Sequence, residues 1–211
     1  MRRIEQLTLI LVLVLGMGVG PALAAGGDVN FLFGQKSLSE NAFDDAGVDG
    51  QSQFGISVTL DFQWPVKLAI DYLSSSDDAT KTVAAAFPLQ LDTDVETTEL
   101  DVGVRKFWRD DKIQPFVGGG LAFVQLEARQ TESGTLGPGA PFSTLIVDDD
   151  DSGVGLWING GFMYRASNHF NVGLDVRYSN ADADLSPPQA GSDLGLDSGG
   201  IHYGVALGYH W

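Results

Sequence analysis

Apolar and polar residues alternate along most of this chain. The closing stretch YGVALGYHW, from Tyr203 to Trp211, shows the pattern clearly, because every second residue is aliphatic or aromatic. A period of two is typical of β-strands, whose successive side chains point to opposite faces. Eight segments repeat it, and we expect eight strands near residues 28–36, 51–62, 66–73, 95–108, 113–129, 153–165, 169–179 and 201–211.

The connections between these segments alternate in length. Short turns lie at 63–65, 109–112 and 166–168, and long loops lie at 37–50, 74–94, 130–152 and 180–199. Short turns on one side and long loops on the other are typical of barrels in the bacterial outer membrane. Most of the segments also have the length that a tilted strand needs to cross a bilayer. Because eight is even, both ends of the barrel domain are expected on the turn side, in the periplasm.

The start of the chain has the features of a secretory signal peptide. Two arginines, Arg2 and Arg3, precede an apolar run over residues 7–19, and Ala22-Leu23-Ala24 has the small-x-small form of a cleavage site. The apolar run is too short for a membrane-spanning helix. We expect a signal peptide over residues 1–24, cleavage after Ala24, export from the cytoplasm, and a barrel domain over 25–211.

Charge and cysteine content narrow the function classes. The formal net charge is -16, and removal of the signal peptide leaves about -17, which argues against a nucleic-acid partner. There is no cysteine, so an exported form of the chain has no disulfide framework.

The polar face of the alternating segments carries charges of both signs in equal number. Such a balance suits a buried, mutually paired network, whereas a solvated face of so acidic a protein should itself be acidic. We therefore expect the polar face to line a narrow barrel interior and the apolar face to meet lipid. A soluble sandwich with the opposite arrangement is the alternative fold. The expected interior network consists of Lys67, Asp71, Glu99, Asp101, Arg105, Glu127, Arg129, Arg165, Asp175 and Arg177.

Aromatic residues gather near the ends of the expected strands. Two belts of aromatic rings mark the lipid interfaces of membrane barrels. We expect these interface aromatics to be Phe62, Trp64, Trp108, Phe170, Tyr178, Tyr203, Tyr209 and Trp211.

With its leader, its strand-loop rhythm and the ending YGVALGYHW, the chain resembles the small eight-stranded outer-membrane barrels of the OmpA, OmpX and opacity-protein type. The resemblance covers essentially residues 26–211. It implies an all-β fold, a single eight-stranded antiparallel up-and-down transmembrane barrel in the outer membrane of a Gram-negative cell. It also implies that the barrel assembly machinery recognises the C-terminal strand, although family members usually end in Phe and this chain has Trp211.

Two features suggest chemistry. The acidic run Asp148, Asp149, Asp150 and Asp151 is a weak candidate for divalent cations, which could bridge the loops to lipopolysaccharide; a solvated acidic surface is the simpler interpretation. The stretch RYSNAD resembles the motif of outer-membrane lipid A deacylases, which places a catalytic His two residues before the Ser. Here Arg177 stands two residues before Ser179, so the base is missing and we expect no enzyme.

The sequence thus predicts an integral outer-membrane barrel with a structural or surface-interaction role and acidic extracellular loops. A low-conductance channel or transporter for small or hydrophobic solutes is the first alternative, because eight strands leave room for side chains or one small ligand. A lipid-modifying enzyme is the second. Outer-membrane lipid and lipopolysaccharide are the expected partners, and no cofactor is expected.

Overall fold

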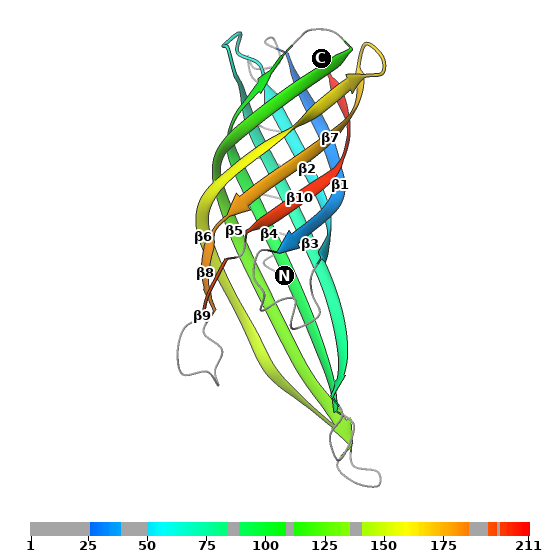
Figure 1. Cartoon of the computed structure of the whole chain (residues 1–211), viewed down its shortest axis with the longest axis vertical. Coiled ribbons are helices and arrows are strands. Elements are labelled where there is room, and N and C mark those ends of the chain that lie inside the picture. The colour runs from blue at the N-terminus through cyan, green and yellow to red at the C-terminus, as the bar shows by residue number, and fades with distance from the viewer. Residues whose placement is uncertain are drawn as a thin grey trace.

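The computed structural model describes residues 26–38, 50–83, 89–108, 112–135, 141–185, 194–197 and 199–211. Eight antiparallel strands of this part form a closed barrel in the order β1-β10-β7-β6-β5-β4-β3-β2 (Figure 1), which confirms the predicted fold. Two further short strands pair with each other between β7 and β10. The strands are β1 (Gly27–Leu38), β2 (Gly50–Leu60), β3 (Lys67–Val83), β4 (Leu89–Phe107), β5 (Ile113–Thr135), β6 (Pro141–Arg165), β7 (Phe170–Asn180), β8 (Asp182–Leu185), β9 (Leu194–Asp197) and β10 (Gly200–His210).

The barrel closes between its first and last strands. β1 pairs with β2 on one side and with β10 on the other, where Asp28 faces His210 and Leu38 faces Gly200. Reciprocal backbone hydrogen bonds between Gly27 and Trp211, of 3.1 and 3.3 Å, extend this seam to the end of the chain. Closure gives every wall strand a partner on both sides. In the hydrocarbon core of a membrane this is required, because no water is present to bond the backbone N–H and C=O groups.

Tight turns gather at one end of the barrel, the upper end in Figure 1, which we call the turn end. The segment between β2 and β3 spans residues 61–66, and Gln63 adopts a left-handed φ of 63° there. The Asp61 carboxylate accepts a 2.8 Å hydrogen bond from the Gln63 N–H and so stabilises this turn. Between β6 and β7, the Ala166 N–H donates to the carbonyl of Phe170 at 2.9 Å.

Four strands continue past the barrel wall at the opposite end, and we call this extension of β3, β4, β5 and β6 the arm (Figure 1). β3 pairs with β2 only as far as Ser76 but with β4 as far as Val83. β5 and β6 stay paired up to Thr135 and Pro141. The predicted long loops at 74–94 and 130–152 are therefore wrong over most of their length.

Loops are predicted there because these segments lack alternating apolar residues. They form strands nevertheless, because several of their residues favour an extended backbone. Threonine is β-branched and fits an extended backbone, and the arm carries Thr80, Thr82 and Thr93. A cross-strand hydrogen bond of 2.8 Å from the Thr80 hydroxyl to Asp92 supports the pairing. The loop predicted at 180–199 likewise contains β8 and β9, which pair from Asp182↔Asp197 to Leu185↔Leu194.

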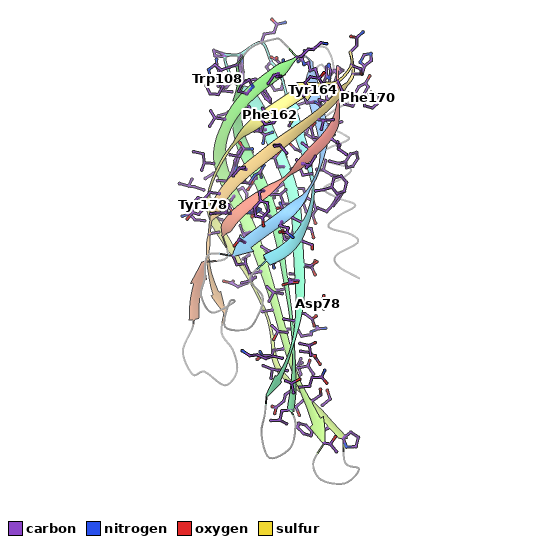
Figure 2. All side chains as sticks on the ribbon, turned by 45° about the vertical axis from the view of Figure 1, so that its right-hand side comes forward. Asp78, Trp108, Phe162, Tyr164, Phe170 and Tyr178 are labelled. Carbon is purple, nitrogen blue, oxygen red and sulfur yellow. The ribbon has the colours of Figure 1, made fainter. Side chains whose placement is uncertain are left out.

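Inside and outside are inverted relative to a soluble protein. Along β7, residues alternate strictly between exposed and buried, and the exposed ones are Phe170, Val172, Leu174, Val176, Tyr178 and, at the end of the strand, Asn180. The buried ones include an arginine and an aspartate. Figure 2 shows side chains covering the outside of the wall, with Trp108, Tyr164 and Phe170 near the turn end and Tyr178 toward the other. Among the described residues, no helix is long and apolar enough to cross a membrane.

Glycine makes room for this polar interior. Gly103 of β4 and Gly120 of β5 are paired on adjacent strands of the wall, and a Cβ on either would clash with the neighbouring backbone. Gly103 lies two residues before the buried Arg105, on the same face of β4, so the pair leaves the lumen there without two side chains. The Gly118-Gly119-Gly120 stretch is thus part of the barrel wall.

Candidate functional site: the polar interior and the aromatic belts

Two buried arginines organise the centre of the lumen. The Arg177 guanidinium of β7 donates hydrogen bonds to the carboxylates of Asp71 and Asp101, and its Nε lies 3.8 Å from Asp175 Oδ1. Arg105 of β4 donates to the same Asp71 at 2.7 Å. Asp71 therefore bridges the two arginines, and three strands, β3, β4 and β7, meet through one charge network.

Aromatic rings flank both guanidinium groups. The guanidinium carbon of Arg177 lies 5.0 Å from the centre of the Trp157 ring. That of Arg105 lies 5.9 Å from the same ring and 5.3 Å from Phe116. Cation–π contacts at these distances are favourable, more so where water is excluded.

A second polar cluster lies nearer the arm. Lys36 Nζ is 3.4 Å from Glu99 Oε2, and the Ser179 hydroxyl donates to the same oxygen at 3.2 Å. His202 Nε2 lies 3.0 Å from Ser179 Oγ, and its Nδ1 lies 3.1 Å from Gln53 Oε1. The cluster draws on five strands, β1, β2, β4, β7 and β10, and ties the two sides of the barrel seam together.

The Ser179–His202 contact places an imidazole beside the Ser of the RYSNAD stretch. The base missing from the RYSNAD stretch is supplied by the neighbouring strand, since His202 pairs opposite Arg177 in the β7–β10 register. Geometry alone would suit a nucleophile and its base. However, Ser179 and His202 are 0% and 3% exposed, and Glu99 occupies the space beside the hydroxyl. The hydroxyl is enclosed by lumen side chains, and the contact contributes to the packing of the polar interior.

Pairing is what allows so many charges inside one narrow barrel. An ionised group without a partner in such a site costs several kcal/mol. The buried carboxylates of Asp71, Glu99, Asp101 and Asp175 are each hydrogen-bonded, to cationic or neutral side chains. For Asp175 the main partner is the amide of Asn159, which donates to it at 2.7 Å.

Eight of the ten charges predicted for the interior lie on the inward face. Six belong to or border the two clusters, and Lys67 and Arg165 lie at the turn-end mouth of the lumen. Glu127 and Arg129 do not lie inside, so the prediction for these two residues is wrong. They sit on the arm part of β5, on the opposite face from Leu126, which is fully buried.

Sequence reasoning missed several inward-facing polar residues. Lys36, Gln51 and His202 are all buried. The sequence pattern could have identified two of them. Lys36 and His202 occupy the alternate positions that point inward, whereas Phe33 and Tyr203 on the same strands occupy the positions that point outward. Gln51 lies at the start of β2, where it accepts from the Thr97 hydroxyl at 3.0 Å and donates to the Val95 carbonyl at 3.2 Å.

The eight predicted interface aromatics all lie exposed on the outer surface. On β7, Phe170 and Tyr178 are eight residues apart, which for a strand tilted by about 40° corresponds to roughly 20 Å along the barrel axis. This is close to the apolar band of about 25 Å between the two aromatic belts of membrane barrels. Near the turn end the rings contact one another, with Phe62 5.5 Å from Trp64 and Phe170 6.1 Å from Tyr209.

The acidic run predicted as a weak metal candidate lies on β6, within the arm. The side chains of Asp148, Asp149 and Asp150 fall outside the described part, and Asp151 is half-buried. Among the described residues, no group of three or more metal-ligating side chains converges.

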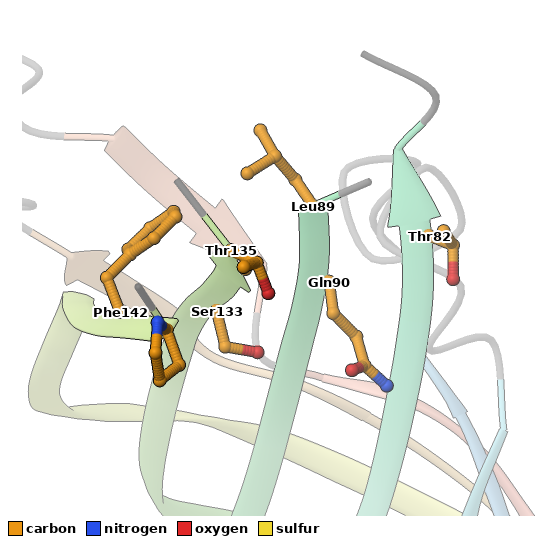
Figure 3. Close-up of a pocket in the computed structure, with 8 residues that line it drawn as sticks. Thr82, Leu89, Gln90, Ser133, Thr135 and Phe142 are labelled. Carbon is orange, nitrogen blue, oxygen red and sulfur yellow. The ribbon is translucent and has the colours of Figure 1, made fainter. Parts of the chain in front are cut away.

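The arm carries a groove near its tip, shown in Figure 3. Its lining is uncharged, with hydroxyl and amide groups beside an aromatic ring. Side chains from β3, β4, β5 and β6 contribute, among them Thr82, Leu89, Gln90, Ser133, Thr135 and Phe142.

A closed barrel with an apolar outside, aromatic belts and a polar core defines a barrel of the outer-membrane type. The family model described as outer membrane protein beta-barrel domain matches residues 7–210, and the chain belongs to this family, whose members are located in the bacterial outer membrane. No curated protein sequence matches the chain.

Solved structures share the fold at low sequence identity. The chain is similar to the outer membrane protein OprG from Pseudomonas aeruginosa, with a TM-score of 0.55, 12% identity, and coverage of 89% of this chain and 96% of the other. It is also similar to Ail, the attachment invasion locus protein of Yersinia pestis, in complex with the heparin analogue sucrose octasulfate. There the TM-score is 0.53, the identity 11%, and the coverage 88% of this chain and 98% of the other.

Proposed function

We propose that this outer-membrane barrel is closed by its internal charge network and acts at the cell surface through the arm. The observation that carries the proposal is the continuation of β3, β4, β5 and β6 well past the barrel wall (Figure 1). A hairpin that served only to join wall strands would end near Ser76, where β2 stops pairing with β3. The extra length displays side chains away from the lipid surface.

Two surfaces of the arm are available for contact. One is acidic, with Asp78, Asp92 and Asp94 among its residues, and Figure 2 shows Asp78 on the part of the arm next to the barrel wall. The other is the uncharged groove of Figure 3, where Phe142 lies beside the hydroxyls of Ser133 and Thr135. Loops and extensions on a rigid scaffold are where binding residues concentrate.

The remaining parts of the proposal follow from the sequence. The chain is exported by a signal peptide over residues 1–24 that is cleaved, and the assembly machinery of a Gram-negative cell inserts it through its C-terminal strand. The arm then faces outward toward lipopolysaccharide, with divalent cations as bridges between acidic groups. The turn end faces the periplasm.

Cysteine labelling tests the orientation of the arm. The chain has no cysteine of its own, so a single introduced thiol reports one position without background. Thr82→Cys in the arm should react on intact cells with a maleimide reagent too large for porins. Lys112→Cys, exposed at the turn end, is the matched control and should react only after the outer membrane is broken. Labelling of Lys112→Cys but not Thr82→Cys on intact cells would reverse the orientation and overturn the proposal.

A narrow channel is the second candidate, and one observation favours it. Three carboxylate oxygens in the lumen, Asp71 Oδ1, Glu99 Oε1 and Asp101 Oδ1, are buried without a hydrogen-bond partner among the described residues. Buried polar atoms of this kind are normally satisfied by water. A hydrated path along the network is the physical basis for conductance.

Planar-bilayer recording separates the two candidates. Purified wild-type protein should give no channel events, because the paired charges and the Trp157 ring fill the lumen. Asp101→Asn combined with Arg177→Met removes one ion pair from the centre of the plug and is the positive comparison, expected to raise the frequency of events. Reproducible events with the wild type would establish the channel and reject the closed barrel.

A further inference from the structure

The turn-end mouth of the lumen contains a cavity built from four strands and a turn. Its walls include Lys67 from β3, Arg105 and Phe107 from β4, Gln114 from β5 and Arg165 from β6, with Asp61 at the rim. Three of these six side chains are cationic in a chain whose net charge is -16. The cavity is therefore a local exception to the acidic character of the molecule.

Three side chains here have hydrogen-bond donors that the described residues do not use. Arg105 is 1% exposed, and its terminal nitrogens bond Asp71, Ser57 and Thr59, while its Nε has no partner. Gln114 is 5% exposed, and its side-chain amide has no partner among the described residues.

The third of these side chains is Arg165. No carboxylate of the described residues pairs with its half-buried guanidinium. Gln114 and Arg165 thus bring to the lining of this cavity side-chain donors that no described residue accepts.

The nearby acids are already engaged by another cation. Lys67 Nζ lies 3.4 Å from Asp28 Oδ2 and 3.7 Å from Asp61 Oδ2, and 5.0 Å from the centre of the Phe107 ring. Asp28 also accepts from the Asn171 amide at 3.3 Å. The two acids thus neutralise Lys67, and among the described residues no carboxylate engages the Arg165 guanidinium.

We propose that this cavity binds a small anion through a carboxylate or phosphate group. Guanidinium groups present paired N–H donors that match both kinds of oxyanion, and a carboxamide adds a neutral donor that fixes orientation. The partial enclosure of the cavity strengthens these bonds relative to open water. The Phe107 ring offers an apolar contact for the carbon part of an organic anion.

Calorimetric titration of the folded barrel tests the site. The full chain in maltoside micelles, free of phosphate, is titrated with inorganic phosphate and, separately, with succinate. The wild type should bind at least one of them with one-to-one saturation, and whichever binds identifies the oxyanion group. Arg165→Gln removes a charged donor that pairs with no described carboxylate, and should weaken binding by about tenfold or more.

Two further variants make the test specific. Lys112→Gln removes the same charge at the same end but outside the cavity, and should bind as the wild type does. Gln114→Met keeps the size of the side chain and removes the amide, so it should weaken binding even if Arg165→Gln does not fold. No saturable binding of either anion, or an equal loss in Lys112→Gln, would overturn the proposal.

Discussion

At the residue scale, Arg177 is central to the charge network of the lumen. It contacts three carboxylates, those of Asp71, Asp101 and Asp175, and lies over the Trp157 ring. In the RYSNAD stretch it stands at the position where the lipid A deacylase motif has its catalytic His. In the fold it neutralises acids from β3, β4 and β7, so its role is structural.

Arg177→Met should therefore destabilise the barrel strongly. Methionine fills a similar volume but leaves Asp101 without the cation that bonds it and Asp71 with Arg105 alone, which costs about 3–5 kcal/mol. Urea unfolding in phospholipid vesicles, followed through the four tryptophans, measures the change in the free energy of unfolding. Arg129→Gln on the exposed part of the arm is the control and should cost less than about 1 kcal/mol.

A double-mutant cycle sharpens this prediction. Adding Asp101→Asn to Arg177→Met removes one of the uncompensated charges while keeping the shape of the side chain, so it should recover part of the lost stability. Equal small losses for Arg177→Met and Arg129→Gln would show that the network does not hold the barrel together.

How far the sequence predicts the interior depends on how clear the parity is. Where apolar residues alternate without interruption, as around Asp71 and Asp175, the inward face follows directly. In β5 the Gly118-Gly119-Gly120 stretch carries no side chains, so both parities look alike and the assignment of Glu127 and Arg129 failed. The cavity donors Gln114 and Arg165 come from separate strands, and only the barrel register brings them to one mouth.

At the element scale, the eight wall strands could be predicted and the arm could not. A strand in the wall has lipid on one side and the lumen on the other. Its residues therefore alternate between apolar and polar, and this period is visible in the sequence. The arm has water on its outer face, so the pattern fades although pairing continues from Asp77↔Val95 to Val83↔Leu89. Its strands are stabilised by backbone pairing and by contacts such as Thr80 to Asp92, which leave no period in hydropathy.

The arm also keeps a small apolar core where it leaves the barrel. Leu38, Val95 and Leu126 are buried together, with Ala79 and Ala128 packed against them. In the strand register, this cluster lies on the arm side of Lys36 and Glu99. Apolar side chains thus cover the polar interior at the junction with the arm. This arrangement is consistent with the closed barrel that we propose.

At the scale of the whole molecule, the two faces of the wall make opposite demands on the same strands. The lumen requires paired charges, while the outer face requires apolar side chains over the height between the belts. Leu174 lies midway between Phe170 and Tyr178 on β7 and is exposed on the outer surface. It marks the position where lipid contact should be most complete.

Leu174→Arg should consequently cost far more than Phe170→Arg. A charge at the middle of the hydrocarbon destabilises a membrane barrel by about 2–4 kcal/mol, whereas near the interface the cost falls to about 0–1 kcal/mol. Reversible urea unfolding in phospholipid vesicles measures both variants under the same conditions. On a water-exposed face the two arginines would be equally tolerated, because neither would lose hydration. A difference that follows depth therefore assigns the apolar face to lipid, and equal effects would assign it to water and leave the buried charges as the interior of a soluble barrel.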